Sequence, residues 1–475
     1  MDRPAPARPR VRRLFVRGLA LVHLAALGSL WWQLEALVGS QGILPVAPWL
    51  EAVGEYHGAS AVWRVPTLAW LWPDTAGLHA LCGLGVGAAL ALLLGVAWEG
   101  PLLAILAVVY LSLSVVGREF LSFQWDTLLV ESTVAGLVVA RWHPSDRPAP
   151  PWAWWILWWL AFRLMFGAGF VKLWSGDEAW ASVAALDVHF ETQPLPNPLS
   201  WWAHHLPRSL LRVGVVLTFV VELVLPWLIV AGRAGRAALF VGATGLMAAL
   251  ALTGNYGFFQ PLTVVLCLTV LDDGHLAAVF GGPVVARPPW RPVPWGRAAG
   301  AGLLLGLSLL RVPLHVVPYD RLPTWWQSAV AAIAPFRIVN QYGLFAVMTT
   351  ERPEVVLEAS QDGRRWRELS LRAKPGPLDR VPPQVAPHMP RVDWQLWFAA
   401  LGRCERQPWL WSLMARIREG SPAITPLFVP GTFDDGPPRH VRAVRYRYRF
   451  TEPGAEGIWT RERLGLYCPP QGPGG

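Results

Sequence analysis

Apolar runs constrain this chain most, because about 20 consecutive apolar residues form a helix long enough to cross a membrane. Hydrophobic residues make up 53% of the 475 residues and charged residues only 15%, whereas soluble domains contain about 25% charged residues. The sequence therefore predicts a polytopic α-helical membrane protein with about nine spans. The predicted spans lie near 14–38, 79–98, 101–117, 126–141, 152–173, 210–231, 237–254, 258–272 and 297–316.

The distribution of arginine predicts the orientation of these spans, because short cytoplasmic loops hold an excess of Lys and Arg. With the Arg-rich N-terminus inside, the inner segments become 99–100, 141–148, 232–236 and 273–296, and all but the first contain arginine. The outer segments become 39–78, 118–125, 174–209, 255–257 and everything after about residue 317. The pattern predicts a cytoplasmic N-terminus and an extracytoplasmic C-terminal region.

Strand patterns replace the long apolar runs from Asn340 onward. The segment EVVLEAS at 354–360 and the segment RRWRELSL at 364–371 flank Asp362 and a glycine, which is typical of a β-hairpin. The segment VRAVRYRYRF at 441–450 alternates in the way a half-buried strand does. One face of that strand is predicted to hold Val444, Tyr446, Tyr448 and Phe450.

Two short amphipathic helices are predicted between these strands, DWQLWFAALG at 393–402 and PWLWSLMARIREG at 408–420. We therefore expect a β-rich or α+β domain that is large enough to hold its own core. The predicted division of the chain is a basic cytoplasmic N-terminus at 1–13, a multi-span domain at 14–316 with outer loops 39–78 and 174–209, a connector at 317–339, the β-rich domain at 340–467 and a tail at 468–475.

The net charge of +9 suits membrane topology better than nucleic-acid binding, because no basic stripe coincides with a nucleic-acid-binding fold signature. Cys82 and Cys267 fall in apolar runs and are expected to pack in the core. Cys404 and Cys468 remain as candidates for a disulfide, which would form if the C-terminal region lies outside the cytoplasm. The spacing of the two cysteines does not decide whether they pair.

Five ionisable residues fall in or near predicted spans, where each must face the interior of the bundle or water and find a partner. We predict an ion pair between Arg163 and either Glu222 or Glu131. A structural role is the simpler interpretation of this pair, and substrate handling is the alternative. The others are Glu35 and Asp126, and Asp126 is expected to cap the start of its span.

The segment from Lys172 into the outer loop 174–209 is unusually rich in chemically active side chains. They include Lys172, Asp187, His189, Glu191, His204 and His205. Three interpretations remain open. The histidines and Glu191 could bind zinc, although their spacing matches no strong metal signature, and we predict neither a metal nor a cofactor.

Lys172 could act as a base or nucleophile with a pKa changed by burial, or it could simply extend toward the membrane surface. The interpretation that we favour is architectural. Pro194, Pro196 and Pro198 fix the backbone and remove amide donors, which predicts a rigid, extended loop. In that case the loop presents or braces its aromatic and histidine side chains. Arg163, Glu222 and the loop residues are candidates for a cavity or for the loop itself, and the sequence does not decide between these.

Several polar blocks together resemble the lipase maturation factor family of endoplasmic reticulum and bacterial membrane proteins. The blocks are FLSFQWDTLLVESTVAGLV, RLMFGAGFVKLWSG, HFETQPLPNPLSWWAHHLP, TGNYGFFQPLTVVLCLTVLDD, IVNQYGLFAVMTTERPEVVLEAS, PHMPRVDWQLWFAALG and VRAVRYRYRFT with the Gly-Ile-Trp that follows. They occur in the family's order and cover nearly the whole chain from about residue 25. ETQPLPNPLSWW and YGLFAVMTTERPE are the most specific.

The resemblance implies a chaperone-like protein that assists the folding of exported proteins, for example lipases. In animals the family implies a factor for certain secreted dimeric lipases, with the C-terminal part in the lumen. The expected partners here are membrane lipids and a partly folded secreted protein, and the expected location is a bacterial inner membrane. The family offers no catalytic residues to transfer.

A second, shorter resemblance indicates an enzyme as the alternative function. AGFVKLWSGDEAW at 168–180 is similar to the A-G-x-x-K-L segment of vitamin K-dependent gamma-carboxylases and their bacterial transmembrane relatives. Lys172 falls on the lysine that serves there as a base on the reduced quinone. The alternative prediction is therefore a membrane enzyme that acts on a lipid or quinone-like substrate.

Overall fold

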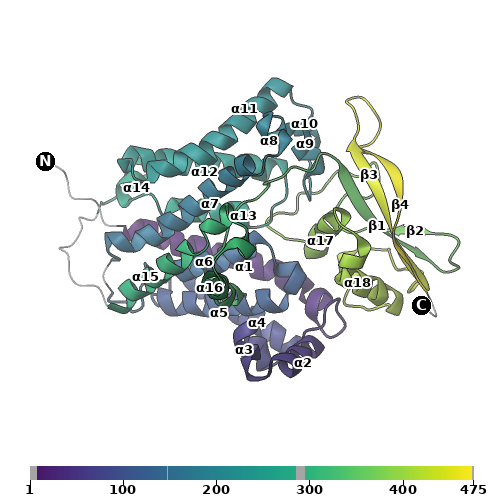
Figure 1. Cartoon of the computed structure of the whole chain (residues 1–475), viewed down its shortest axis with the longest axis horizontal. Helices are drawn as coiled ribbons and strands as arrows, with labels where there is room; N and C mark the ends of the chain where they lie inside the picture. Colours follow the sequence, from purple (N-terminus) through teal and green to yellow (C-terminus); the bar gives the residue numbers. More distant parts are fainter. Residues whose placement is uncertain (1–7, 147, 285–294, 473–475) are drawn as a thin grey trace.

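A helical bundle and a four-stranded sheet make up the protein, and the sheet covers one end of the bundle (Figure 1). The computed structural model describes residues 8–146, 148–284 and 295–472. Parts of the predicted N-terminus (1–7), of the inner segment (285–294) and of the tail (473–475) lie outside the described residues. The prediction of a polytopic helical protein with a C-terminal sheet domain is confirmed.

Seven of the described helical segments are long and apolar enough to cross a membrane. They are α1 (Pro9–Val38), α4 (Thr75–Leu94), α5 (Glu99–Val116), α7 (Trp155–Trp174) with the turn before it, α11 (Arg208–Phe219) with its continuation to Ile229, α12 (Gly232–Thr253) and α15 (Trp295–Leu309) with its continuation to His315. A pair of helices bent by 105°, α13 (Phe259–Leu268) and α14 (Asp273–Phe280), makes an eighth span if it is counted as one.

The predicted span 126–141 differs from these, because its helix α6 (Gln124–Gly136) has only 13 residues. At about 1.5 Å per residue it is shorter than the hydrocarbon core of about 30 Å. The chain nevertheless passes from one end of the bundle to the other here. Asp126 contacts Arg391 beside the sheet domain, whereas Arg141 pairs with Glu99 at the opposite end.

The segments that the arginine pattern assigns to the inside meet at the end of the bundle remote from the sheet. Glu99 lies 3.4 Å from Arg12 and 3.0 Å from Arg141. Asp273 accepts a 3.0 Å hydrogen bond from the backbone amide of Arg10. These contacts explain why α1 begins beside α5 and α14, and they place three predicted inner segments together.

The predicted outer segments gather at the sheet end. Arg416 donates to the carbonyl of Gly42 at 3.0 Å, and Asn255 donates to the carbonyl of Pro383 at 2.9 Å. The two groups of segments therefore occupy opposite ends of the bundle, as the orientation requires. Which end faces the cytoplasm stays a prediction.

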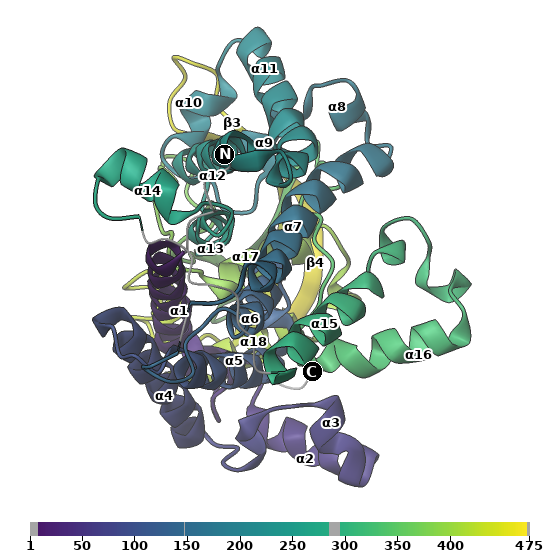
Figure 2. The same ribbon diagram turned by 90° about the vertical axis from the view of Figure 1, so that its left-hand side faces the viewer.

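The outer loops contain short helices. Residues 39–78 form α2 (Val46–His57) and α3 (Ala61–Arg64), which lie apart from the main bundle (Figure 2). Within 174–209 the structure has α8 (Glu178–Ala181), α9 (Ala185–Thr192) and α10 (Ser200–His204). The prediction of an extended loop is thus wrong for most of this segment, because apart from short turns only the proline-containing stretch between α9 and α10 is free of helix.

The predicted connector at 317–339 holds a further helix, α16 (Thr324–Ile333). Together with α15 it projects from one side of the bundle (Figure 2). Trp325 of α16 is 63% exposed, and such apolar side chains suit contact with lipid.

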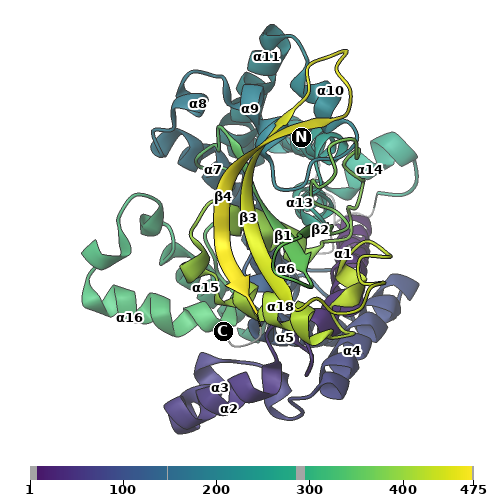
Figure 3. The same ribbon diagram turned by 90° about the vertical axis from the view of Figure 1, so that its right-hand side faces the viewer.

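The sheet has the strand order β2-β1-β3-β4, with all neighbours antiparallel (Figure 3). The strands are β1 (Arg352–Ser360), β2 (Arg367–Leu369), β3 (His440–Phe450) and β4 (Trp459–Gln471). The predicted hairpin is confirmed, with Leu357 opposite Leu369. Asp362 stabilises its turn by accepting bonds of 2.9 and 2.8 Å from the amides of Arg364 and Arg365.

Both predicted helices of this domain are confirmed, as α17 (Arg391–Ala400) and α18 (Pro408–Glu419). They pack on the sheet, and β1 is buried along its whole length. The register shifts between β3 and β4 place their extra residues in β4, so β3 keeps the predicted alternation and pairs with β1 without a break. On the predicted apolar face Tyr448 is fully buried, whereas Tyr446 is only partly buried.

Candidate functional site

Lys172 forms a buried ion pair with Glu222 between α7 and the continuation of α11. Its Nζ lies 2.8 and 3.0 Å from the two carboxylate oxygens, and donates to the carbonyl of Ala168 at 3.2 Å. The ammonium also lies 5.2 Å from the centre of the Trp180 ring. Lys172 therefore binds a carboxylate and does not extend to the membrane surface.

The backbone around Glu222 is a π-helical segment, Val220–Val224, inserted after α11. Such segments are rare and occur often at functional sites. Gly169 of α7 faces this segment, and a Cβ placed on it would lie 2.8 Å from the Cβ of Glu222. A residue without a side chain thus allows the close approach that brings Lys172 and Glu222 together.

A small cavity adjoins the pair. Lys172, Glu222, Tyr256 and Phe345 are among the residues that line it, and its volume is about 50 Å³. A cavity needs about 10–15 Å³ to hold a water molecule, whereas sites for small organic ligands measure about 300–1,000 Å³. The cavity therefore has room for water and lacks the room that a quinone would need.

His189 lies beside this cavity on α9. Tyr256 links it to the proline block, with its hydroxyl 3.2 Å from the His189 Nε2 and donating to Gln193 at 2.8 Å. The ring of His189 meets the Phe345 ring edge-to-face at 5.2 Å. Burial, with a contribution from the charge of Lys172, lowers the pKa of His189 to about 4, so the imidazole is neutral at neutral pH.

Arg163 pairs with Glu131, one of its two predicted partners, while Glu222 belongs to Lys172. Glu131 also accepts a 2.6 Å bond from the hydroxyl of Tyr342 and bonds of 2.9 and 3.0 Å from Asn340. This network fixes the start of the C-terminal region against α6 and α7.

The remaining predicted loop residues lie away from Lys172, near the sheet. Glu191 accepts a 2.7 Å bond from the amide of Phe450, and burial raises the pKa of its carboxyl. His204 lies 5.5 Å from the Phe450 ring, and His205 bonds to the carbonyl of Trp201 at 2.7 Å. Asp187 is partly buried on α9. Among residues 8–146, 148–284 and 295–472, no group of three or more His, Cys, Asp or Glu side chains is placed to hold a metal ion.

Arg352 at the start of β1 is a central residue that the sequence interpretation missed. It is fully buried and donates to the carbonyls of Glu191 at 2.7 Å and of Pro194 at 3.0 Å. Its charge is balanced by Glu354 at 2.6 Å, which also pairs with Lys374 at 2.8 Å. The proline block is therefore held by the sheet domain, which supports the architectural interpretation.

Arg391 forms a second buried link between the domains. Its guanidinium makes two bonds of 2.6 and 2.8 Å to Asp126, which also accepts a 2.6 Å bond from the hydroxyl of Tyr110. Asp126 lies in the first turn of α6, so its charge is near the positive helix terminus as predicted, but Phe123 holds the N-cap position and no side chain caps the helix. The signal for this pair was the isolated charge in an apolar run, but its partner lies 265 residues away.

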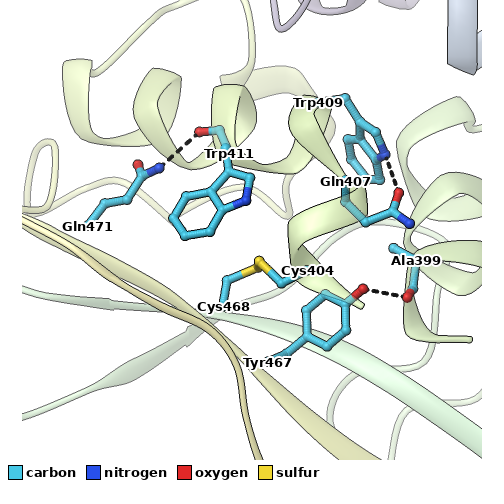
Figure 4. Close-up of a disulfide and its surroundings, with 8 residues drawn as sticks. All are labelled: Ala399, Cys404, Gln407, Trp409, Trp411, Tyr467, Cys468 and Gln471. Atoms are coloured by element: carbon cyan, nitrogen blue, oxygen red, sulfur yellow. Dashed lines mark hydrogen bonds between the residues drawn. A yellow bond between two sulfur atoms is a disulfide. The ribbon is translucent and has the colours of Figure 1, made fainter. Parts of the chain in front are cut away.

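A disulfide joins Cys404, between α17 and α18, to Cys468 on β4 (Figure 4). The hydroxyl of Tyr467 donates to the carbonyl of Ala399 beside this bond, and Gln471 donates to the carbonyl of Trp411 (Figure 4). Cys82 and Cys267 are buried and unpaired. The disulfide thus ties the longest strand to the helices that cover the sheet.

Comparison with known proteins identifies the family. The model of the lipase maturation factor transmembrane domain matches residues 10–278, and that of the lipase maturation factor C-terminal domain matches residues 338–469. The chain belongs to the lipase maturation factor family. No solved structure matches it.

Relatives in this family cover most of the chain. Human lipase maturation factor 2 is 34% identical, over 95% of this chain and 81% of its own length. Bovine lipase maturation factor 1 is 33% identical, over 97% of this chain and 88% of its own length. These similarities, the small cavity and the pairing of Lys172 with Glu222 give no support to the alternative of a membrane enzyme with Lys172 as its base.

Proposed function

We propose that this membrane protein assists the maturation of an exported lipase by binding the partly folded enzyme. The observation that carries the proposal is the match to both family domains, in order, with relatives named lipase maturation factors. Binding to a folding intermediate would favour productive folding and shield apolar surface from aggregation.

The outer surface of the sheet domain is the region that we propose contacts the client. β4 is an edge strand of the sheet, and edge strands present backbone groups that can pair with another chain. Leu464 and Leu466 on β4 are 41% and 51% exposed. An extended, partly apolar segment of a client fits such a surface.

We further propose that the protein lies in a bacterial inner membrane, with its sheet domain outside the cytoplasm. The disulfide supports this side, because disulfides persist in oxidising compartments and are rare in the cytosol. The gathering of the arginine-containing loops at the opposite end of the bundle supports it as well.

The test is complementation of a strain that lacks the gene, with the secreted lipase measured both as activity and as protein amount. The full-length protein should restore activity per amount of lipase. A variant with Leu464→Asp and Leu466→Asp should lose most of this effect, whereas Leu401→Asp, at a similarly exposed leucine (42%) at the end of α17, should retain it.

An unchanged set of exported proteins in the deletion strain would contradict the proposal. Equal complementation by the β4 variant would contradict the proposed client surface while leaving the maturation role in place.

A further inference from the structure

A groove of about 490 Å³ lies between α7 and the end of the α15 span. It differs from the small cavity at Lys172 both in volume and in its lining residues. Its wall on α7 is aromatic, because Phe162, Phe166 and Phe170 follow one another at helical spacing with ring centres 5.2 and 6.0 Å apart. Val312 and Val316 line the other side. The groove is thus apolar along most of its length.

Two guanidinium groups, of Arg163 and Arg311, line the same groove. Arg163 is bound to Glu131, but its Nε is buried without a partner. The side chain of Arg311 makes no hydrogen bond or ion pair with any residue in the described part of the chain, and its Nε is also buried. Glu131 is paired with Arg163, and no acid in the described part of the chain forms an ion pair with Arg311, so the groove retains an excess positive charge.

A charged group within a membrane-spanning segment is costly unless it finds a partner. Arg311 lies in the span Trp295–His315 and Arg163 in the span Pro151–Trp174. A carboxylate is an anion that matches a guanidinium well, because the two can form parallel, charge-assisted hydrogen bonds. The lining therefore combines an anion site with a slot for an apolar chain.

The volume limits the size of the occupant. At about 490 Å³ the groove falls in the range of about 300–1,000 Å³ that holds one small organic molecule. A single acyl chain satisfies this limit better than a lipid with two chains. Gly167 allows the backbone of Tyr342 to approach α7 closely beside the groove, because a Cβ there would lie 2.7 Å from the carbonyl oxygen of Tyr342.

We propose that the groove binds one long-chain carboxylate, a free fatty acid. Its carboxylate accepts hydrogen bonds from the guanidinium of Arg311, with the positive charge of Arg163 nearby, and its chain lies along the aromatic wall of α7. The occupant neutralises the excess charge that the protein leaves unpaired. This site is separate from the client surface on the sheet domain.

The test measures binding of radiolabelled palmitate to the full-length protein in nanodiscs of phosphatidylcholine. Saturable binding is expected, and Arg311→Gln should weaken it about tenfold, which corresponds to about 1.4 kcal/mol. Arg311→Lys should recover part of the affinity because it keeps the charge. Arg321→Gln, on the exposed turn after the groove, is the matched control and should bind as the original protein does.

Phe166→Ala should also weaken palmitate binding, and more strongly than it weakens binding of an eight-carbon acid, because only the longer chain reaches along the wall. Unfolding temperatures of the variants establish that the fold is intact. Unchanged affinity in Arg311→Gln overturns the proposal. Displacement of palmitate by phosphatidylglycerol at equal concentration overturns the assignment to a single-chain acid, and absence of saturable binding overturns both.

Discussion

Individual side chains determine whether a buried charge in this bundle has a partner, and the Lys172–Glu222 pair is the clearest example. Removing one partner leaves the other buried and unpaired, which costs about 3–5 kcal/mol. Lys172→Met should therefore lower the unfolding temperature of the purified protein. The double variant Lys172→Met with Glu222→Leu should recover most of the loss, because an apolar pair of similar size avoids the buried charge.

The control for this pair is Glu35→Gln, because the carboxylate of Glu35 is 57% exposed although it pairs with His79. That change should have little effect. A Lys172→Met variant that unfolds at the original temperature would show that the ammonium is not buried with Glu222. Thermal unfolding in detergent, followed by intrinsic fluorescence, measures all four proteins.

His189 makes the stability of the protein depend on pH. Its pKa is lowered to about 4 in the folded state, against about 6.5 in the unfolded chain. Between these values the unfolded state binds more protons, so stability is full above about pH 6.5 and falls as the pH drops toward 4. The loss from this residue is about 3 kcal/mol at most, since each pKa unit is worth about 1.4 kcal/mol.

His189→Gln removes this titration, and its amide can still bond to Tyr256. Unfolding temperatures measured from pH 7.5 to pH 4.5 should therefore fall less steeply for the variant than for the original protein. His143→Gln, at an exposed histidine, should leave the pH profile unchanged. Identical slopes for the original protein and His189→Gln would contradict a buried neutral imidazole.

The sequence could predict that these charges need partners, but it could not choose the partners. Arg163 had two candidates, and only the packing of α6 against α7 selects Glu131. Glu222 meets Lys172 because a π-helical segment and Gly169 bring two helices unusually close. Neither feature has a periodic signature, so the pairing depends on tertiary structure.

At the scale of elements, the disulfide fastens β4 to the helices that cover the sheet. The bond closes a loop with a sequence separation of 64. Chain-entropy arguments assign about 4 kcal/mol to a loop of this length. Cys404→Ser with Cys468→Ser should lower the stability of the sheet domain, seen as earlier unfolding and faster cleavage by a protease.

The control for the disulfide is Cys82→Ser, which removes a buried thiol without a bond. A shift in mobility on a non-reducing gel should separate the original protein from the double variant and leave Cys82→Ser unchanged. If reduction changes neither the mobility nor the protease resistance of the original protein, the bond does not form.

The Asp126–Arg391 pair connects α6 to α17 and should control docking of the sheet domain. Arg391→Met leaves Asp126 buried beside Tyr110 without its cation, which costs about 3–5 kcal/mol. We expect faster protease cleavage in the segment between the bundle and β1. Arg406→Met, at an exposed arginine of the same domain, should be cleaved at the original rate.

Elements with strong periodic patterns were predictable, and those shaped by neighbours were not. The hairpin of β1 and β2 and the helices α17 and α18 follow from turn chemistry and from apolar spacing. The short helices of the segment 174–209 could not be predicted from local sequence, because this segment is held by contacts with the sheet domain. Arg352, which supplies those contacts, lies more than 140 positions further along the chain.

At the scale of the whole molecule, the predicted inner loops and the predicted outer loops lie at opposite ends of the bundle. The arginines of the inner group are paired with Glu99 and Asp272, and the outer group is covered by the sheet domain. This separation could be predicted from the arginine distribution. Under the positive-inside rule, this separation predicts that the end with the arginine-containing loops faces the cytoplasm and that the sheet domain faces the other side.

Fusions with alkaline phosphatase test that orientation, because the enzyme is active only outside the cytoplasm. A fusion after the last residue of the chain should be active, and a fusion within the loop 141–148 should be inactive. A fluorescent protein that matures in the cytoplasm should give the reverse result at both places. Phosphatase activity in the loop 141–148 with none at the C-terminus would invert the assignment, and the sheet domain and its disulfide would then face the cytoplasm.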